Sequence, residues 1–190
     1  MIMFEKFLEV PRKKVLILTA IISFVSVIIL ILVMDLFDDG MIPFTIIDFE
    51  FSWTGSRSQE IMTAWESNGG LQSSIIFNYL DFAFMLAYGS FGFSILVLLA
   101  RSFNENEKHR KIGLICSVLP IVSAVFDVIE NINLLIMQHN FPLTPLDIMA
   151  TIASISAFIK FGALIIAIIF MLYGLSFSLV MKLKRAEKND

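Results

Sequence analysis

The sequence predicts an all-α membrane protein, a four-helix transmembrane bundle, from its composition and from the lengths of its apolar segments. Hydrophobic residues make up 57% of the 190 residues and charged residues only 16%, whereas soluble domains are about half apolar and about a quarter charged. Four segments are apolar over at least the ~20 residues that a helix needs to cross a bilayer: 15–34, 74–99, 112–137 and 148–181. We therefore expect a single membrane domain over residues 1–190.

The orientation of the spans follows from the basic residues. Twelve of the fourteen Lys and Arg residues lie in the N-terminal segment, the 100–111 loop and the C-terminal tail, whereas the 35–73 loop carries seven acids and one base, Arg57. Cytoplasmic loops of membrane proteins are enriched in Lys and Arg. Both termini are therefore predicted to be cytoplasmic in a multi-pass protein of the cell membrane, with the 35–73 loop outside.

The outer loop is predicted to contain two ordered elements. In IDFEFSW, residues 47–53, apolar and polar residues alternate, which is typical of a half-buried extended segment. In the following SRSQEIMTAWESNGG, Ser58 is expected to cap a short helix that ends at Gly69 or Gly70. The loop is either a passive cover over the helix ends or a lid over a binding cavity, and the pattern leaves both interpretations open.

The last apolar segment, 148–181, is long for one crossing, so its helix is expected to tilt or to project into the cytoplasm. One face of this helix is largely small, which suits close packing inside the bundle or a homodimer through the last span. The residues of this small face are Ala153, Ala157, Lys160, Leu164, Ala167, Met171 and Gly174.

Polar residues inside the second and third spans follow helical spacing. In the third span Asp127, Glu130 and Asn131 share one helix face, because residues three and four apart are neighbours on a helix surface. The second span has a similar face, formed by Ser74, Asn78, Asp81, Met85 and Tyr88. Ionisable residues at such positions usually face a protein interior or a water-filled cavity, where they pair or act in function.

Lys160 is the only base inside the predicted spans. A rise of ~1.5 Å per residue places Asp127 roughly 15 Å, Asp81 roughly 10 Å and Lys160 roughly 18 Å below the outer surface. We therefore expect Lys160 and Asp127 to form a structural ion pair, with Glu130 and Asp81 about one turn nearer the surface. Three acids facing one base leave excess negative charge. Glu130 and Asp81 are therefore expected to share a proton near neutral pH, as an interacting pair.

Three functions are compatible with this pattern. The first is an acidic intramembrane pocket that binds a lipid or a hydroxylated or cationic amphiphile. The second is an isomerase-like acid–base enzyme acting on an apolar substrate, with Glu130 and Asp81 as candidate catalytic residues. The third is a structural subunit of a larger membrane complex. The candidate ligand-binding residues are Asp81, Tyr88, Asp127, Glu130, Asn131 and Asn78.

Other chemistries have little support in the sequence. His109, His139 and Cys116 do not occur in the spacing of a zinc site, and no phosphate- or dinucleotide-binding motif is present. The basic clusters flank apolar spans, where they meet anionic lipid. We therefore expect no metal, no cofactor and no nucleic-acid partner, and we expect contacts with membrane lipids.

Two stretches carry a resemblance to known proteins. With LDFAFMLAYGS (80–90) and PIVSAVFDVIEN (120–131), the chain resembles a group of small prokaryotic membrane proteins that have four spans and an acidic, tryptophan-containing loop. That resemblance implies an architecture rather than an activity. In span count and buried acids the chain is also similar to the EXPERA group, which includes sterol isomerases and sigma-2-type receptors. This second similarity implies a membrane-facing ligand cavity in which Asp81, Asp127 and Glu130 take part.

Overall fold

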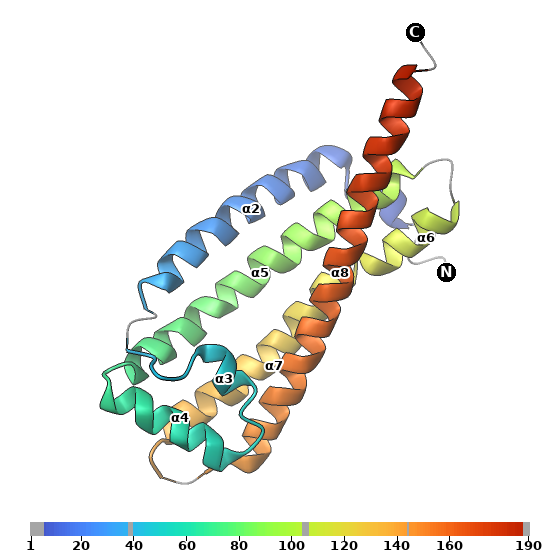
Figure 1. The fold of residues 1–190 in the computed structure, drawn as a ribbon. Helices are drawn as coiled ribbons and strands as arrows, with labels where there is room; N and C mark the ends of the chain where they lie inside the picture. Colours follow the sequence, from blue (N-terminus) through green and yellow to red (C-terminus); the bar gives the residue numbers. More distant parts are fainter. Residues whose placement is uncertain (1–5, 38–39, 104–106, 144, 188–190) are drawn as a thin grey trace.

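The computed structural model describes residues 6–37, 40–103, 107–143 and 145–187, with side chains described as far as residue 180. The orientation prediction also used the acids at 38 and 39 and the basic residues beyond 181. Their side chains lie outside the described range. The described residues form helices and no strand, so the all-α prediction is confirmed (Figure 1). The elements are η1 (Lys6–Leu8), α2 (Lys13–Asp35), α3 (Ile46–Glu50), α4 (Gly55–Ser67), α5 (Leu71–Ser102), α6 (Glu107–Cys116), α7 (Leu119–Asn140) and α8 (Asp147–Glu187).

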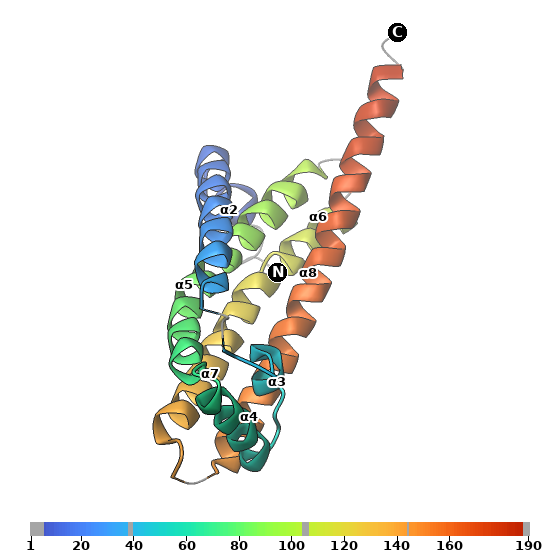
Figure 2. The same ribbon diagram turned by 60° about the vertical axis from the view of Figure 1, so that its left-hand side comes forward.

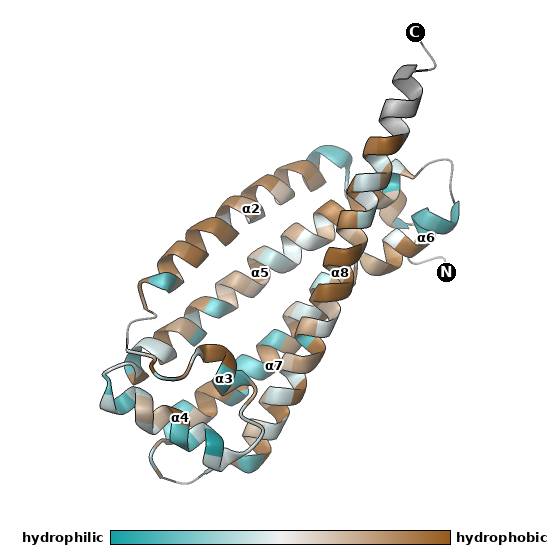
Figure 3. Cartoon of the chain, viewed as in Figure 1, coloured by the Kyte–Doolittle hydropathy of each residue, from teal (hydrophilic) through white to brown (hydrophobic). Residues whose placement is uncertain are grey.

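Four helical segments are long and apolar enough to cross a membrane: α2, α5, α6 together with α7, and α8. The hydropathy colouring shows apolar ribbon along most of α2 and polar residues gathered in α4 and α6, at the two ends of the molecule (Figure 3). This pattern of apolar middles and polar ends is that of a multi-pass membrane protein.

The four long helices do not pack as an even bundle. α7 packs extensively against α8 and α5, whereas α2 packs mainly against α5. In the views of Figures 1 and 2, α2 lies along α5 and is separated from α8. Most of the apolar side chains of α2 are accordingly exposed, as suits a helix that faces lipid on several sides.

The third predicted span, 112–137, is divided into α6 and α7 by a turn at residues 117–118. Pro120 lies in the first turn of α7, where its missing N–H leaves no unpaired group. α5 approaches this point closely: a Cβ on Gly92 would lie 2.7 Å from Cγ of Pro120. Glycine at this position therefore allows α5 and α7 to pack closely.

The prediction of an extended segment at 47–53 is wrong, because residues 46–50 form the short helix α3. Thr45 and Asp48 make a reciprocal capping box, which starts a helical turn in place of a strand. The turn brings Ile46, Phe49 and Glu50 to one side, and Phe49 and Glu50 are buried. The residues that face the interior are thus spaced three and four apart, as on a helix, and do not alternate as on a strand.

The short helix predicted after this segment is α4, but it begins earlier than expected. Thr54 caps it by accepting a hydrogen bond from the backbone N–H of Arg57, and the predicted cap Ser58 is buried one turn inside the helix. Trp65 of α4 packs on Phe49 of α3 within an apolar cluster that also includes residues of α7 and α8. α3 and α4 are therefore packed onto one end of the helices, here called the loop end.

The small face of α8 is turned into the molecule. Ala153, Ala157, Lys160 and Ala167 are buried, and Gly174 lies against Leu99 and Phe103. This face therefore packs inside the bundle, and the homodimer through the last span stays a prediction. Figure 1 also shows α8 projecting beyond the other helices at the end opposite α3 and α4, as its length predicts.

Candidate functional site

Three carboxyl groups surround the ammonium of Lys160 in the interior. Nζ lies 3.1 Å from Oδ1 of Asp127, 2.8 Å from Oε2 of Glu130 and 3.4 Å from Oε1 of Glu50. All four side chains are buried. The structure thus brings together Lys160 and Asp127, the pair expected from their depth, and adds two further acids from different elements.

α7 supplies two of these acids from consecutive turns. Asp127, Glu130 and Asn131 are all buried, on the face that the spacing predicts. Lys160 reaches this face from α8, and its ammonium also lies 4.7 Å from the ring centroid of Phe161. The expected division of roles, with Asp127 paired and Glu130 apart, does not describe the geometry, because Lys160 donates hydrogen bonds to both.

Glu50 is the residue that sequence reasoning missed, since it counted only as one acid of the outer loop. Thr45 caps the start of α3, and Glu50 is the last residue of this short helix. Ser154 of α8 holds the backbone at and just after Glu50. Ser154 Oγ donates to the Glu50 carbonyl at 2.8 Å and accepts from the Trp53 N–H at 2.9 Å. Trp53 has a positive φ of 59°, an uncommon conformation for a bulky residue that these contacts maintain.

Burial raises the pKa of the Glu50 carboxyl, and the neighbouring Lys160 ammonium offsets only part of that rise. Glu50 Oε2 is buried with no hydrogen-bond partner among the described residues. Such an oxygen lacks a donor for as long as the carboxyl is ionised, which is a costly state in an interior.

Tyr88 links α5 to this cluster. Its hydroxyl donates to Oδ2 of Asp127 at 2.7 Å and lies 3.2 Å from Oγ of Ser123. Ser123 in turn donates to the backbone carbonyl of Lys160 at 3.1 Å. Asp127 therefore accepts hydrogen bonds on both oxygens, from Tyr88 on Oδ2 and from Lys160 on Oδ1.

The remaining polar residues of α5 pair with α7 nearer the loop end. Asn131 Nδ2 donates to Oδ2 of Asp81 at 2.6 Å. Asn78 Nδ2 donates to Oε1 of Gln138 at 3.0 Å, and Gln138 donates to Ser74. Asp81 thus has an amide partner, and no hydrogen bond joins it to Glu130 among the described residues. Glu130 instead shares the Lys160 ammonium with Asp127 and Glu50.

A cavity of about 560 Å³ adjoins the cluster, and residues of α2, α3, α5, α7 and α8 line it. We call it the acidic cavity. Its volume lies within the roughly 300–1,000 Å³ of small-molecule sites. Its polar lining is Asp35, Glu50, Asp81, Tyr88, Asp127 and Lys160, and its apolar lining is Ile31, Met34, Ile46, Phe77, Phe84, Phe161, Leu164 and Ile168.

The candidate ligand-binding residues divide into two groups around the acidic cavity. Asp81, Tyr88 and Asp127 line it. Glu130, Asn131 and Asn78 are described but are not part of its lining; they are buried behind it, in contact with Lys160, Asp81 and Gln138 respectively. α3 contributes Ile46 and Glu50 to the wall, so part of the outer loop forms one side of the cavity.

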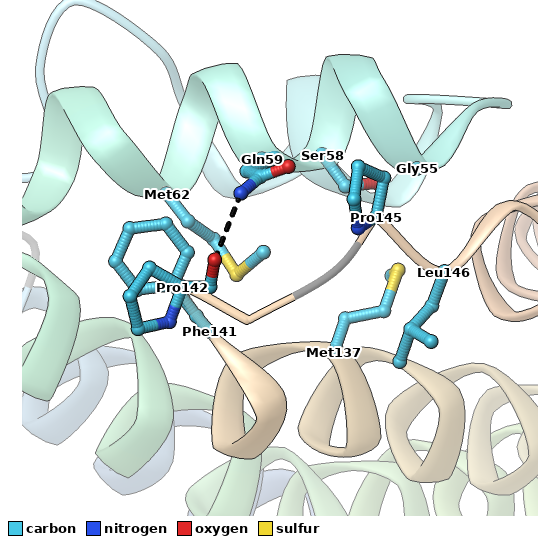
Figure 4. A pocket seen from close by; sticks show the side chains of 9 residues that line it. All are labelled: Gly55, Ser58, Gln59, Met62, Met137, Phe141, Pro142, Pro145 and Leu146. Atoms are coloured by element: carbon cyan, nitrogen blue, oxygen red, sulfur yellow. Dashed lines mark hydrogen bonds between the residues drawn. The ribbon is translucent and has the colours of Figure 1, made fainter.

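A second cavity lies between α4 and the connection from α7 to α8 (Figure 4). Its volume is about 10 Å³, which is about the size of one water molecule. Gln59 Nε2 crosses it to donate to the carbonyl of Pro142 at 3.1 Å. This space separates two packed segments and is too small for an organic ligand.

No protein-family model, curated protein or solved structure matches the chain.

Proposed function

We propose that the chain is a multi-pass protein of the cell membrane, with both termini in the cytoplasm, whose acidic cavity binds a lipid or a hydroxylated or cationic amphiphile. The observation that carries this proposal is the lining of the cavity, which combines apolar walls with a group of charged residues. An amphiphile has the same two parts, an apolar tail and a polar head.

The positions of the lining residues suggest how the ligand is oriented. Glu50 and Asp81 lie toward the loop end, whereas Leu164 and Ile168 follow Lys160 along α8 by one and two turns. A head group near the acids would therefore direct its tail along α8, away from α3.

The cavity wall also forms part of the outer surface of the helices. Ile31 of α2 and Ile168 of α8 both line the cavity, and each is 48% exposed. Since the surface of α2 and α8 is apolar, a ligand dissolved in the bilayer could enter between them. This route supports a membrane-derived ligand over one that arrives from water.

Binding is better supported than acid–base catalysis. A general acid or base must come within about 2.6–3.2 Å of the proton it transfers. Of the two candidate catalytic residues, Asp81 lines the cavity, whereas Glu130 lies behind Lys160 and is fully buried. A substrate in the cavity would meet Glu50 and Asp127 before it met Glu130.

Photo-crosslinking in lipid nanodiscs tests the proposal. Dodecylamine and 1-dodecanol, each with a diazirine on the tail, should label residues around Phe84, Leu164 and Ile168. Leu164→Trp, which fills the cavity wall, should reduce this labelling about tenfold, an effect of ~1.4 kcal/mol in binding. Ile165→Trp is the matched control, because Ile165 is exposed on the same helix. Equal labelling in the two variants would show surface partition and contradict the proposal.

A further inference from the structure

Glu50 and Glu130 come from different parts of the chain and meet at the same ammonium group. Glu50 Oε1 lies 3.4 Å and Glu130 Oε2 lies 2.8 Å from Nζ of Lys160. Glu50 Oε2 is buried and has no hydrogen-bond partner among the described residues. An ionised carboxylate only accepts hydrogen bonds, so a proton held by this pair of carboxyl groups would give that oxygen a partner.

Charges on every element around the pair favour such a proton. α5 contributes Asp81 and the neutral Tyr88, α7 contributes Asp127, and α8 contributes Lys160; Asp35 of α2 stands at the exposed rim. Four buried carboxyl groups thus face one ammonium. Buried charge in excess of its counter-charge is costly, and such groups generally become neutral by taking up a proton.

Only one member of the pair is reachable from the acidic cavity. Glu50 lines the cavity, is 7% exposed and has an oxygen, Oε2, without a hydrogen-bond donor. Glu130 is fully buried behind it. A cationic head group that enters the cavity would therefore act on the pair through Glu50.

We propose that Glu50 and Glu130 hold one proton in common while the acidic cavity is empty, and that an ammonium head group displaces this proton when it binds. The displacement depends on the proposed function, whereas the shared proton does not. In the exchange the carboxylic O–H bond breaks and its proton leaves to water. The ammonium keeps its own protons and pairs with the carboxylate that is formed, so the buried charge is unchanged.

The ligand class follows from this exchange. An alkylammonium stays charged at neutral pH, as a Lys side chain does. It can therefore both balance the negative charge of Glu50 and donate a hydrogen bond to it. A hydroxyl head can donate but carries no charge, so it leaves the proton in place. Binding of a cationic amphiphile is therefore expected to strengthen as pH rises, while binding of a neutral alcohol is expected to change little.

Infrared spectroscopy without ligand tests the shared proton. At pH 7 the wild-type protein should show a protonated-carboxyl band that is lost in Glu50→Gln and lost or shifted in Glu130→Gln. Glu66→Gln, the same change at an exposed site on α4, should keep the band. Circular dichroism establishes whether each variant is folded. If Glu130→Gln does not fold, the spectrum of Glu50→Gln alone tests the shared proton. Absence of the band in the wild type, or its persistence in Glu50→Gln, would overturn the shared proton.

Calorimetry in nanodiscs tests the displacement, using phosphate and Tris buffers, which differ in ionisation enthalpy. Dodecylamine should release about one proton per molecule bound, by linkage, and 1-dodecanol should release none. In Glu50→Gln the release should disappear, while Glu66→Gln should behave as the wild type. Dodecylamine binding without proton release would overturn the displacement alone. Failure of both amphiphiles to bind would overturn the proposed function and the displacement together.

Discussion

Glu50 of the short helix α3 lies within 3.4 Å of Lys160 in the middle of α8. This contact joins the loop between the first two spans to the ion cluster of the last two. The loop is therefore more than a cover over the helix ends, because it supplies one of the three carboxyl groups around the buried ammonium.

Lys160→Met should strongly destabilise the protein, because it leaves three buried carboxyl groups without their counter-charge. Removing one partner of a buried ion pair costs about 3–5 kcal/mol in soluble proteins. Unfolding by sodium dodecyl sulfate in mixed micelles measures the loss. Adding Asp127→Asn should recover part of the stability, and adding Glu130→Gln as well should recover more. If neither addition improves on Lys160→Met, the three groups are not coupled. Lys108→Met, at an exposed site, is the control.

Tyr88→Phe should reduce stability by about 1–3 kcal/mol, because the change removes the donor to Oδ2 of buried Asp127. The ring and its edge contact with Phe84 are retained. Tyr79→Phe is the matched control on the same helix, since Tyr79 is exposed. Equal unfolding curves for the two variants would show that the hydrogen bond contributes nothing measurable.

Stability should fall as pH rises from the ordinary Glu50 pKa of 4.5 toward its raised value in the folded protein. In that window the folded state retains a proton that the unfolded state has lost, so the slope is negative, about 1.4 kcal/mol per pH unit at most for one proton. Above the raised pKa the Glu50 contribution becomes constant. Glu50→Gln should flatten the profile measured between pH 5 and 8, and Glu66→Gln should not. A wild-type profile that rises through this window would contradict the prediction.

Cysteine labelling in intact cells tests the orientation. With an impermeant thiol reagent, Ser56→Cys at the loop end should react and Lys108→Cys at the opposite end should not, because basic loops remain cytoplasmic. Both sites are exposed, whereas the native Cys116 is buried. Labelling at residue 108 and protection at residue 56 would reverse the proposed topology.

Local patterns were sufficient for most of the secondary structure. The apolar lengths predict the four long helices, and the spacing of Asp127, Glu130 and Asn131 predicts their common buried face. The pattern was misleading at 47–53, where an alternation of apolar residues competes with the capping residues Thr45 and Asp48. A cap satisfies backbone groups at once, whereas alternation stabilises a strand only when a neighbouring strand is present.

The sequence by itself determined the class of the protein, because crossing a bilayer imposes length and composition on each helix separately. It also determined that Lys160 needs an acidic partner, since an unpaired charge at that depth is costly. Only the tertiary structure decided which acids those are. Whether Glu130 meets Asp81 or Glu50 depends on the rotation of α7 against α5 and on the path of the loop through α3, and packing between distant segments sets both. The acidic cavity has the same origin, since α2 packs on α5 and remains separate from α8.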